Sequence, residues 1–126
     1  MLIPVLVSLL IAAPSTTIPT YQLRVDLYRG VDTVTTTLRT QEGLVGRVLV
    51  EQGGLFTRIN SRVRRSPTAG CLLVNVSYAM AGTQEAVDKM TVEPLPVMQL
   101  CDATTGRATV DELSYRVTVR ELPEAQ

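Results

Sequence analysis

The sequence lacks the residues on which most enzyme mechanisms depend. Histidine and tryptophan are both absent from its 126 residues. Without histidine there is no imidazole general base, no serine or cysteine nucleophile activated by histidine, and no histidine ligand for zinc. Lys89 is the only lysine, and no Ser-x-x-Lys motif precedes it. Glycine-rich phosphate-binding loops and the Asp-Thr/Ser-Gly motif of aspartic proteases are missing too. Carboxylates, arginines and two cysteines remain.

The carboxylates leave one catalytic alternative open. Two carboxyl groups that face each other can hydrolyse a bond by acid–base chemistry. The candidates here are Asp26, Glu51, Asp111 and Glu112. A hydrolase of this kind needs a pocket with two facing carboxyl groups and a perturbed pKa. Because the other catalytic motifs are missing, we predict no catalytic residue and keep the hydrolase as the alternative to a binding protein.

A second group of carboxylates raises the question of a metal. Asp102, Asp111 and Glu112 lie around Gly106. Oxygen ligands of this kind suit Ca²⁺, but the spacing of an EF-hand loop is absent. Aspartate and threonine beside glycine are ordinary turn residues. We therefore predict turns at these positions, with neither a metal site nor a cofactor.

Three arginines form a stripe in the longest alternating segment. Arg58, Arg62 and Arg64 fall on the same face of a strand, and Arg65 follows them. Such close like charges repel each other unless an anion neutralises them. Glu51 or Asp26 on neighbouring strands could do so within a solvated sheet face. The alternative is a contact surface for an acidic partner or polyanion, and this stripe is the predicted binding site.

The overall charge narrows the kind of partner. The sequence has 12 basic and 12 acidic residues, so its net charge is zero. A neutral chain exerts no long-range attraction on nucleic acid or on an anionic membrane. We therefore expect a protein partner, an acidic one if the arginine stripe is used, and no nucleic acid. The sequence does not specify the oligomeric state.

The two cysteines, Cys71 and Cys101, predict a disulfide. Their spacing excludes a Cys-x-x-Cys redox motif, and two cysteines without histidine cannot complete a zinc site. In an oxidising compartment, a pair of cysteines in a small domain usually forms a disulfide. Two buried free thiols are the alternative.

The elements that must position these residues are strands. Apolar and polar residues alternate with a period of two in most segments after Thr20, and short turns rich in glycine separate them. Strands are expected at 20–29, 31–40, 44–51, 55–64, 72–78, 97–101 and 113–120. Residues 81–89 are expected to form a helical turn or a short loop. Pro94 and Pro96 exclude a central strand at that point, because each removes a ladder donor.

Strands joined by short turns should pair antiparallel. The chain is therefore expected to be an all-β antiparallel sandwich or open barrel of about six or seven strands. Its core should contain the inward residues of the alternating segments: Leu23, Val25, Leu27, Leu55, Ile59, Val63, Leu72, Val74, Val76, Tyr115, Val117 and Val119.

The first fifteen residues have a different character. Residues 2–13 are apolar, about as long as the core of a signal peptide and too short to span a bilayer. Small residues follow, and cleavage after Ser15 avoids Pro14 beside the scissile bond. The segment lacks the lysine or arginine that usually precedes such a core. The alternative is an apolar strand or helix that begins a cytosolic domain.

Together these patterns predict a signal peptide at 1–15 and a single all-β domain at 16–126, located in the periplasm or secreted, with no stable membrane anchor. The predicted function is that of a non-catalytic binding or accessory domain.

Overall fold

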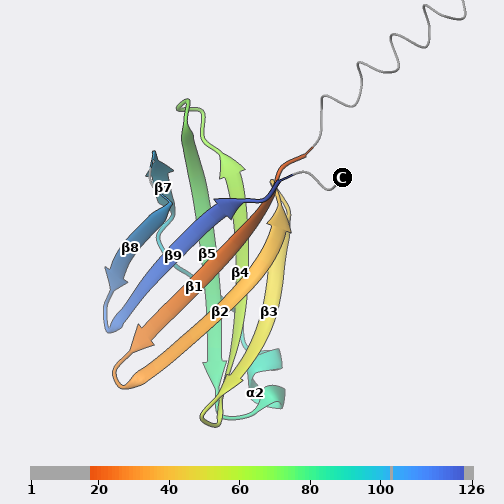
Figure 1. The fold of residues 1–126 in the computed structure, drawn as a ribbon. Helices are drawn as coiled ribbons and strands as arrows, with labels where there is room; N and C mark the ends of the chain where they lie inside the picture. The colour runs from red at the N-terminus through yellow and green to blue at the C-terminus, as the bar shows by residue number, and fades with distance from the viewer. Residues whose placement is uncertain (1–17, 103, 124–126) are drawn as a thin grey trace, which may run out of the picture.

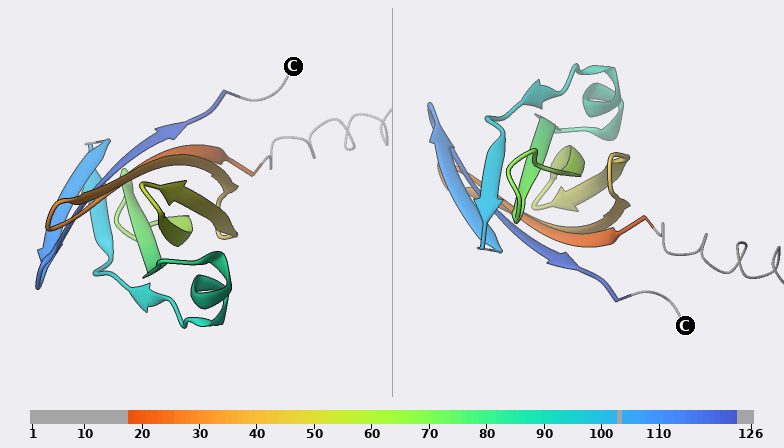
Figure 2. Two further views of the ribbon diagram at one scale, coloured as in Figure 1. Left: turned by 90° about the horizontal axis from the view of Figure 1, so that it is seen from below. Right: turned by 90° about the horizontal axis from the view of Figure 1, so that it is seen from above.

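The computed structural model describes residues 18–102 and 104–123, and the predicted signal peptide lies outside them. Within these residues the chain forms nine strands and one short helix, arranged as two antiparallel sheets that pack face to face (Figure 1, Figure 2). The prediction of an all-β antiparallel fold is confirmed.

The first sheet, sheet A, is built from the two ends of the described chain. Its strand order is β2-β1-β9-β8, with β1 at Thr20–Arg29, β2 at Asp32–Gln41, β8 at Thr105–Val110 and β9 at Leu113–Glu121. The second, sheet B, contains β3 (Val45–Gln52), β4 (Leu55–Arg65) and β5 (Cys71–Ala81). Two short strands, β6 (Glu93–Pro94) and β7 (Met98–Cys101), pair with opposite ends of β5.

The strand count exceeds the prediction for two physical reasons. β6 has only two residues and lies at a sheet edge, where Pro94 is tolerated. β8 begins at Thr105, so the predicted turn around Gly106 was wrong for that glycine. The alternation of β8 is weak in the sequence because small or short side chains occupy its inward positions, while threonine and arginine occupy the outward ones.

The core lies between the sheets and consists of the inward residues of each strand. Of the predicted core residues, Leu55 and Leu72 are partly buried and pack against the core, and the others are buried. Thr57 and Ser61 also point inward from β4 and are buried polar residues. The period of two in the sequence therefore identified the inward faces correctly.

The two sheets approach closely along both lateral seams, and a glycine lies at each. At the seam between β2 and β3, a Cβ on Gly46 would lie 3.0 Å from Leu38 Cδ1. At the seam between β7 and β8, a Cβ on Gly106 would lie 2.7 Å from Leu100 Cδ2 and 2.8 Å from Met98 Sδ. Glycine in a strand commonly marks such a close approach.

The only helix of the described residues, α2 (Gln84–Lys89), covers one end of sheet B. The Thr83 hydroxyl caps it by accepting a hydrogen bond from the Ala86 N–H at 3.1 Å. Val87 is fully buried where the helix packs on β4 and β5. A search of the described residues for a helix long and apolar enough to span a membrane finds none.

Cys71 and Cys101 form the predicted disulfide. They are directly opposite each other on β5 and β7, with Cα atoms 4.2 Å apart. This separation falls just below the range of about 4.4–6.8 Å expected for a disulfide and near the roughly 4.5 Å of a non-hydrogen-bonded antiparallel pair. The bond fastens the short β7 to the long β5.

Candidate functional site

The predicted arginine stripe lies on the outer face of sheet B, where a further arginine joins it. Arg58, Arg62 and Arg64 all point outward from β4, since Thr57, Ile59, Ser61 and Val63 point inward. Arg47 on β3 pairs with Asn60 and therefore lies between Arg58 and Arg62. We call Arg47, Arg58, Arg62 and Arg64 arginine face B.

Arginine face B is linear. Positions 58, 60, 62 and 64 follow one another along β4, and Arg47 supplies the charge at the level of Asn60. Alternate residues of a strand are separated by about 6.8 Å. The face therefore carries one guanidinium beside each of four successive outward positions of β4. Their spacing equals the spacing of alternate side chains in an extended peptide.

Two of these arginines are fixed by neutral groups. Arg58 Nη2 donates to the backbone oxygen of Met90 at 2.6 Å, just after α2, and Arg64 Nη2 donates to Asn75 Oδ1 at 3.3 Å. Their Nε atoms are buried and have no hydrogen-bond partner. Arg58 is thus also a structural residue that holds the end of the helix.

The carboxylates expected to neutralise the stripe are elsewhere. Glu51 lies opposite Phe56, beyond the stripe, and accepts a hydrogen bond from the Gly54 N–H at 3.3 Å. Asp26 belongs to the other sheet. Within residues 18–102 and 104–123, no arginine of face B forms an ion pair.

A shallow hollow accompanies this face. Its volume is about 190 Å³, and its lining combines apolar, hydroxyl, amide and guanidinium groups: Val45, Asn60, Ser61, Arg62, Asn75 and Ser77. The buried Oδ1 atom of Asn60 has no hydrogen-bond partner there. Beside it, Val45 and Leu49 expose 51% and 40% of their surface, so apolar contacts are available next to the charges.

The outer face of sheet A carries a second group of arginines. They point outward from all four strands of the sheet, and we call them arginine face A: Arg24, Arg39, Arg107, Arg116 and Arg120. Asp26 is the one carboxylate among them, and only 1% of its side chain is exposed. Threonines occupy most of the remaining outward positions of β2 and β8.

Asp26 is held by three neighbours. Thr35 Oγ1 donates to its Oδ1 at 2.7 Å, and Arg116 Nε donates to its Oδ2 at 3.0 Å. Arg24 Nε lies 3.4 Å from Oδ1. Burial opposes the ionisation of Asp26, but the hydrogen bonds from Thr35 and Arg116 and the charges of Arg24 and Arg116 together outweigh it and lower the pKa of this carboxyl group.

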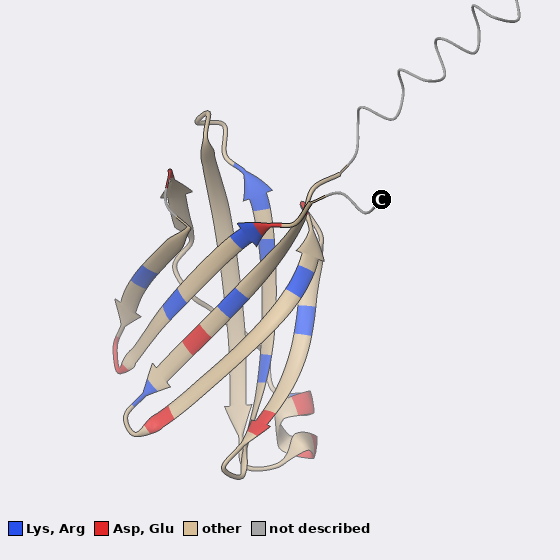
Figure 3. Cartoon of the chain, in the orientation of Figure 1, with Lys and Arg blue, Asp and Glu red and all other residues tan. Residues whose placement is uncertain are grey.

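The charges of this neutral chain are therefore segregated. Among the described residues, Figure 3 shows most of the basic residues as bands along the strands, whereas the acidic residues, apart from Asp26, lie at or near strand ends, in turns and on α2. The two groups of arginines lie on opposite outer faces of the sandwich. The chain therefore has two basic faces although its net charge is zero.

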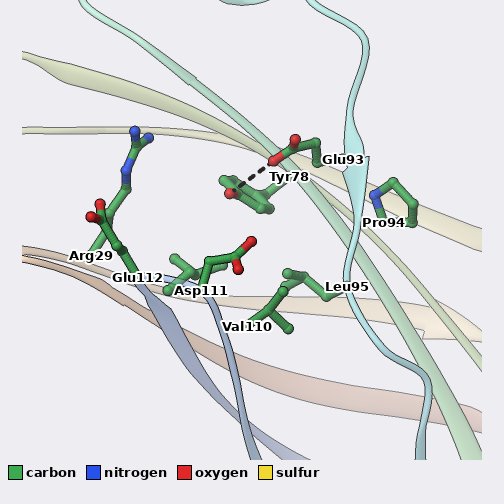
Figure 4. A pocket seen from close by; sticks show the side chains of 9 residues that line it. Arg29, Tyr78, Glu93, Pro94, Leu95, Val110, Asp111 and Glu112 are labelled. Atoms are coloured by element: carbon green, nitrogen blue, oxygen red, sulfur yellow. Dashed lines mark hydrogen bonds between the residues drawn. The ribbon is translucent and has the colours of Figure 1, made fainter.

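The remaining candidate carboxylates lie at an end of the sandwich. Asp111 and Glu112 form the tight turn between β8 and β9, and they line a cavity of about 470 Å³ together with Glu93, Tyr78 and Arg29. In Figure 4 the Asp111 carboxylate points into this cavity, and the Tyr78 hydroxyl donates to Glu93 Oε2 at 3.1 Å. The structure does not bring Asp26 or Glu51 to this cavity.

Asp102 is not part of this acidic group. It follows β7 at the other end of β8, so the predicted cluster around Gly106 is divided between two ends of a strand. No group of three or more candidate metal ligands is present among the residues that the structure describes.

Arg47 and arginine face A were missed by sequence reasoning. Apart from Arg107 on β8, each of these arginines stands at an outward position of a predicted strand, so the signal was present for them. Alternation does not show which distant strands are neighbours, however, and arginine face A is gathered only when β1 pairs with β9.

Comparisons with protein-family models, with curated proteins and with solved structures found no match to this chain.

Proposed function

We propose that this protein is an exported, non-catalytic binding domain that contacts an acidic protein partner through arginine face B. The observation that carries the proposal is a line of four arginines on neighbouring strands without an ion-pair partner among the described residues. These guanidiniums are same-strand or diagonal neighbours, so they repel each other modestly, and a bound anion relieves the repulsion.

The chemistry of the face supports a carboxylate-bearing partner. A guanidinium presents a planar fork of donors that matches a carboxylate, and it binds more specifically than an ammonium. The exposed Val45 and Leu49 add apolar surface beside the charges. An extended acidic segment laid along β4 would meet one arginine at every second residue.

The disulfide supports export. Disulfides persist in oxidising compartments and are rare in the cytosol. The Cys71–Cys101 bond is thus compatible with a periplasmic or extracellular location. Mass spectrometry of the protein recovered from its host should find an amino terminus at or within a few residues of Thr16, and a mature chain that retains Met1 would overturn the proposed export.

A peptide titration tests the binding function. The probe is a labelled peptide of eight residues in which glutamate and threonine alternate, about 27 Å long when extended. Replacing both Arg47 and Arg62 by alanine should weaken its binding about fivefold at low salt, and the wild-type affinity should fall as salt rises. This pair avoids Arg58, which holds α2.

The matched control removes two charges elsewhere. Arg29→Ala with Lys89→Ala changes the net charge by the same amount but leaves both arginine faces intact. It should bind the peptide like the wild type. Equal weakening by both double variants would refute a specific site on face B, because it would show that only net charge matters.

The cavity at the end of the sandwich supports the alternative, a hydrolase that uses a carboxylate pair. Asp111 and Glu112 both line it, and Glu93 lies across from them. The test is hydrolysis of a panel of glycoside and ester substrates. Activity that disappears in the Glu93→Gln and Asp111→Asn variants, while the fold is retained, would establish this function in place of the proposed one.

A further inference from the structure

We propose that arginine face A is a second docking surface for acidic protein segments, which makes the domain bivalent. This inference extends the proposed function, because it assumes that face B binds such a segment. It concerns a different sheet and different residues, so the two can be tested separately.

Face A is free of covering elements within the described chain. The only helix of the described chain, α2, packs on β4 and β5 of the other sheet. Arg24, Arg39, Arg107 and Arg120 are all exposed. Four adjacent strands therefore present a broad polar surface on which five arginines are accompanied by a single, buried carboxylate.

The strand register arranges four of these five arginines in two rows across the sheet, with Arg24 between the rows. One row contains Arg39, Gln22 and Arg120 on three adjacent strands. The other contains Asp26 and, beside it, Arg116 and Arg107. In the first row no carboxylate is present, and Arg120 Nη2 donates only to the amide oxygen of Gln22, at 3.2 Å.

Asp26 shows how this surface binds a carboxylate. Its two oxygens are held by a threonine hydroxyl from β2 and by guanidiniums from β1 and β9. The same donor types recur unneutralised at other outward positions of the same strands, for example at Thr37 and Arg39. The glutamates and aspartates of a partner would find there the same types of donor that already bind Asp26.

The two faces cannot be occupied by one short segment. They are the outer surfaces of two sheets packed against each other, and Figure 2 shows the sheets as opposite layers. A partner on face A therefore leaves face B accessible. One domain would connect two acidic segments, either of one long chain or of two molecules.

Protein NMR with the eight-residue glutamate–threonine peptide tests the inference on the oxidised protein. We expect amide shifts in two groups, one on β3 and β4 and the other on β1, β2 and β9. Replacing Arg39 and Arg120 by alanine should abolish only the second group. These two residues leave the Asp26 ion pairs intact, and thermal melting confirms that the variant is folded.

The outcomes separate the inference from the proposed function. Shifts confined to β3 and β4 would overturn the second surface and leave the proposed function standing. Shifts confined to sheet A would support binding at face A but refute face B, and would therefore overturn the bivalency. No shift with the peptide, but binding of a sulfated polysaccharide or single-stranded DNA, would overturn both, because the partner would then not be an acidic protein.

Light scattering tests bivalency directly. Long poly-glutamate mixed with the wild-type domain at low salt should form cross-linked particles that scatter light. The Arg39→Ala/Arg120→Ala and Arg47→Ala/Arg62→Ala variants should each still bind the polymer but scatter much less. Undiminished scattering by either variant would contradict the two-surface inference.

Discussion

Arg116 binds Asp26 across the junction of the first and last described strands, with its Nε 3.0 Å from Oδ2 and a sequence separation of 90 between the two positions. The strands β1 and β9 are central in sheet A, and the pair lies on its outer face. The contact therefore joins the two ends of the domain and at the same time neutralises part of arginine face A.

Replacing Asp26 by asparagine should destabilise the fold by about 1–3 kcal/mol, because it removes charge-assisted hydrogen bonds to Arg116 and Thr35. Urea unfolding measures the effect. Asp32→Asn is the control, since Asp32 is exposed at the start of β2. Equal unfolding midpoints for the two variants would show that the Asp26 pair contributes no more than a surface charge.

The Asp26 carboxylate also makes the stability of the fold depend on pH in the acidic range. The pKa of Asp26 is lower in the folded state than the roughly 3.9 of an unfolded chain. Its stabilising contribution is therefore complete above the unfolded pKa and is lost as the pH falls through the folded pKa. Between about pH 5 and pH 2, the wild type should lose more unfolding free energy than Asp26→Asn. Parallel curves for the two proteins would disprove the lowered pKa.

The seam between β7 and β8 should not tolerate a methyl group. Gly106→Ala would place a Cβ within 3 Å of Leu100 and Met98, both buried. We expect a cost of about 1–3 kcal/mol from overpacking, partly offset by the better strand propensity of alanine. Gly82→Ala meets no atom within 4 Å and should be nearly neutral in thermal melting. A stabilised Gly106→Ala variant would mean that the sheets are not in close contact there.

Alanine substitutions should lower the free energy of unfolding substantially only at inward positions of the strands. Val74→Ala or Val117→Ala should each cost about 2 kcal/mol, because both side chains are buried. Thr118→Ala, next to Val117 but pointing outward, should cost much less in the same denaturant titration. Arg116→Ala is not a suitable neutral control, since it would leave Asp26 without its closest cation. Comparable losses at positions 117 and 118 would contradict the two-faced sheet.

Removal of the disulfide should destabilise the domain substantially. Cys71 and Cys101 close a loop with a sequence separation of 30. In the loop-entropy description, a loop of this length corresponds to about 3.5 kcal/mol. The double serine variant should therefore unfold at much lower urea concentration than the oxidised wild type. Reductant should shift the wild type toward the variant and leave the variant unchanged; a wild type insensitive to reductant would contradict this role.

Side-chain alternation alone determined much of the fold. Residues such as Val25, Ile59 and Val117 repeat with a period of two, and this period assigns each side chain to a face whichever strand lies beside it. The inward faces, the polar outward faces and the antiparallel connections at short turns were therefore predictable. So was the stripe formed by Arg58, Arg62 and Arg64, because it lies within one strand.

Only the tertiary structure decided which strands distant in the chain are neighbours. Alternation is the same for every possible pairing of strands that are distant in the chain, so it could not place Arg116 on β9 beside Asp26 on β1. It also could not show that the predicted turn at Gly106 is a strand pressed against β7. The Asp26–Arg116 contact depends on strand pairing within a sheet between residues 90 positions apart in the chain. The close approach at Gly106 depends on how the inward faces of the two sheets fit together.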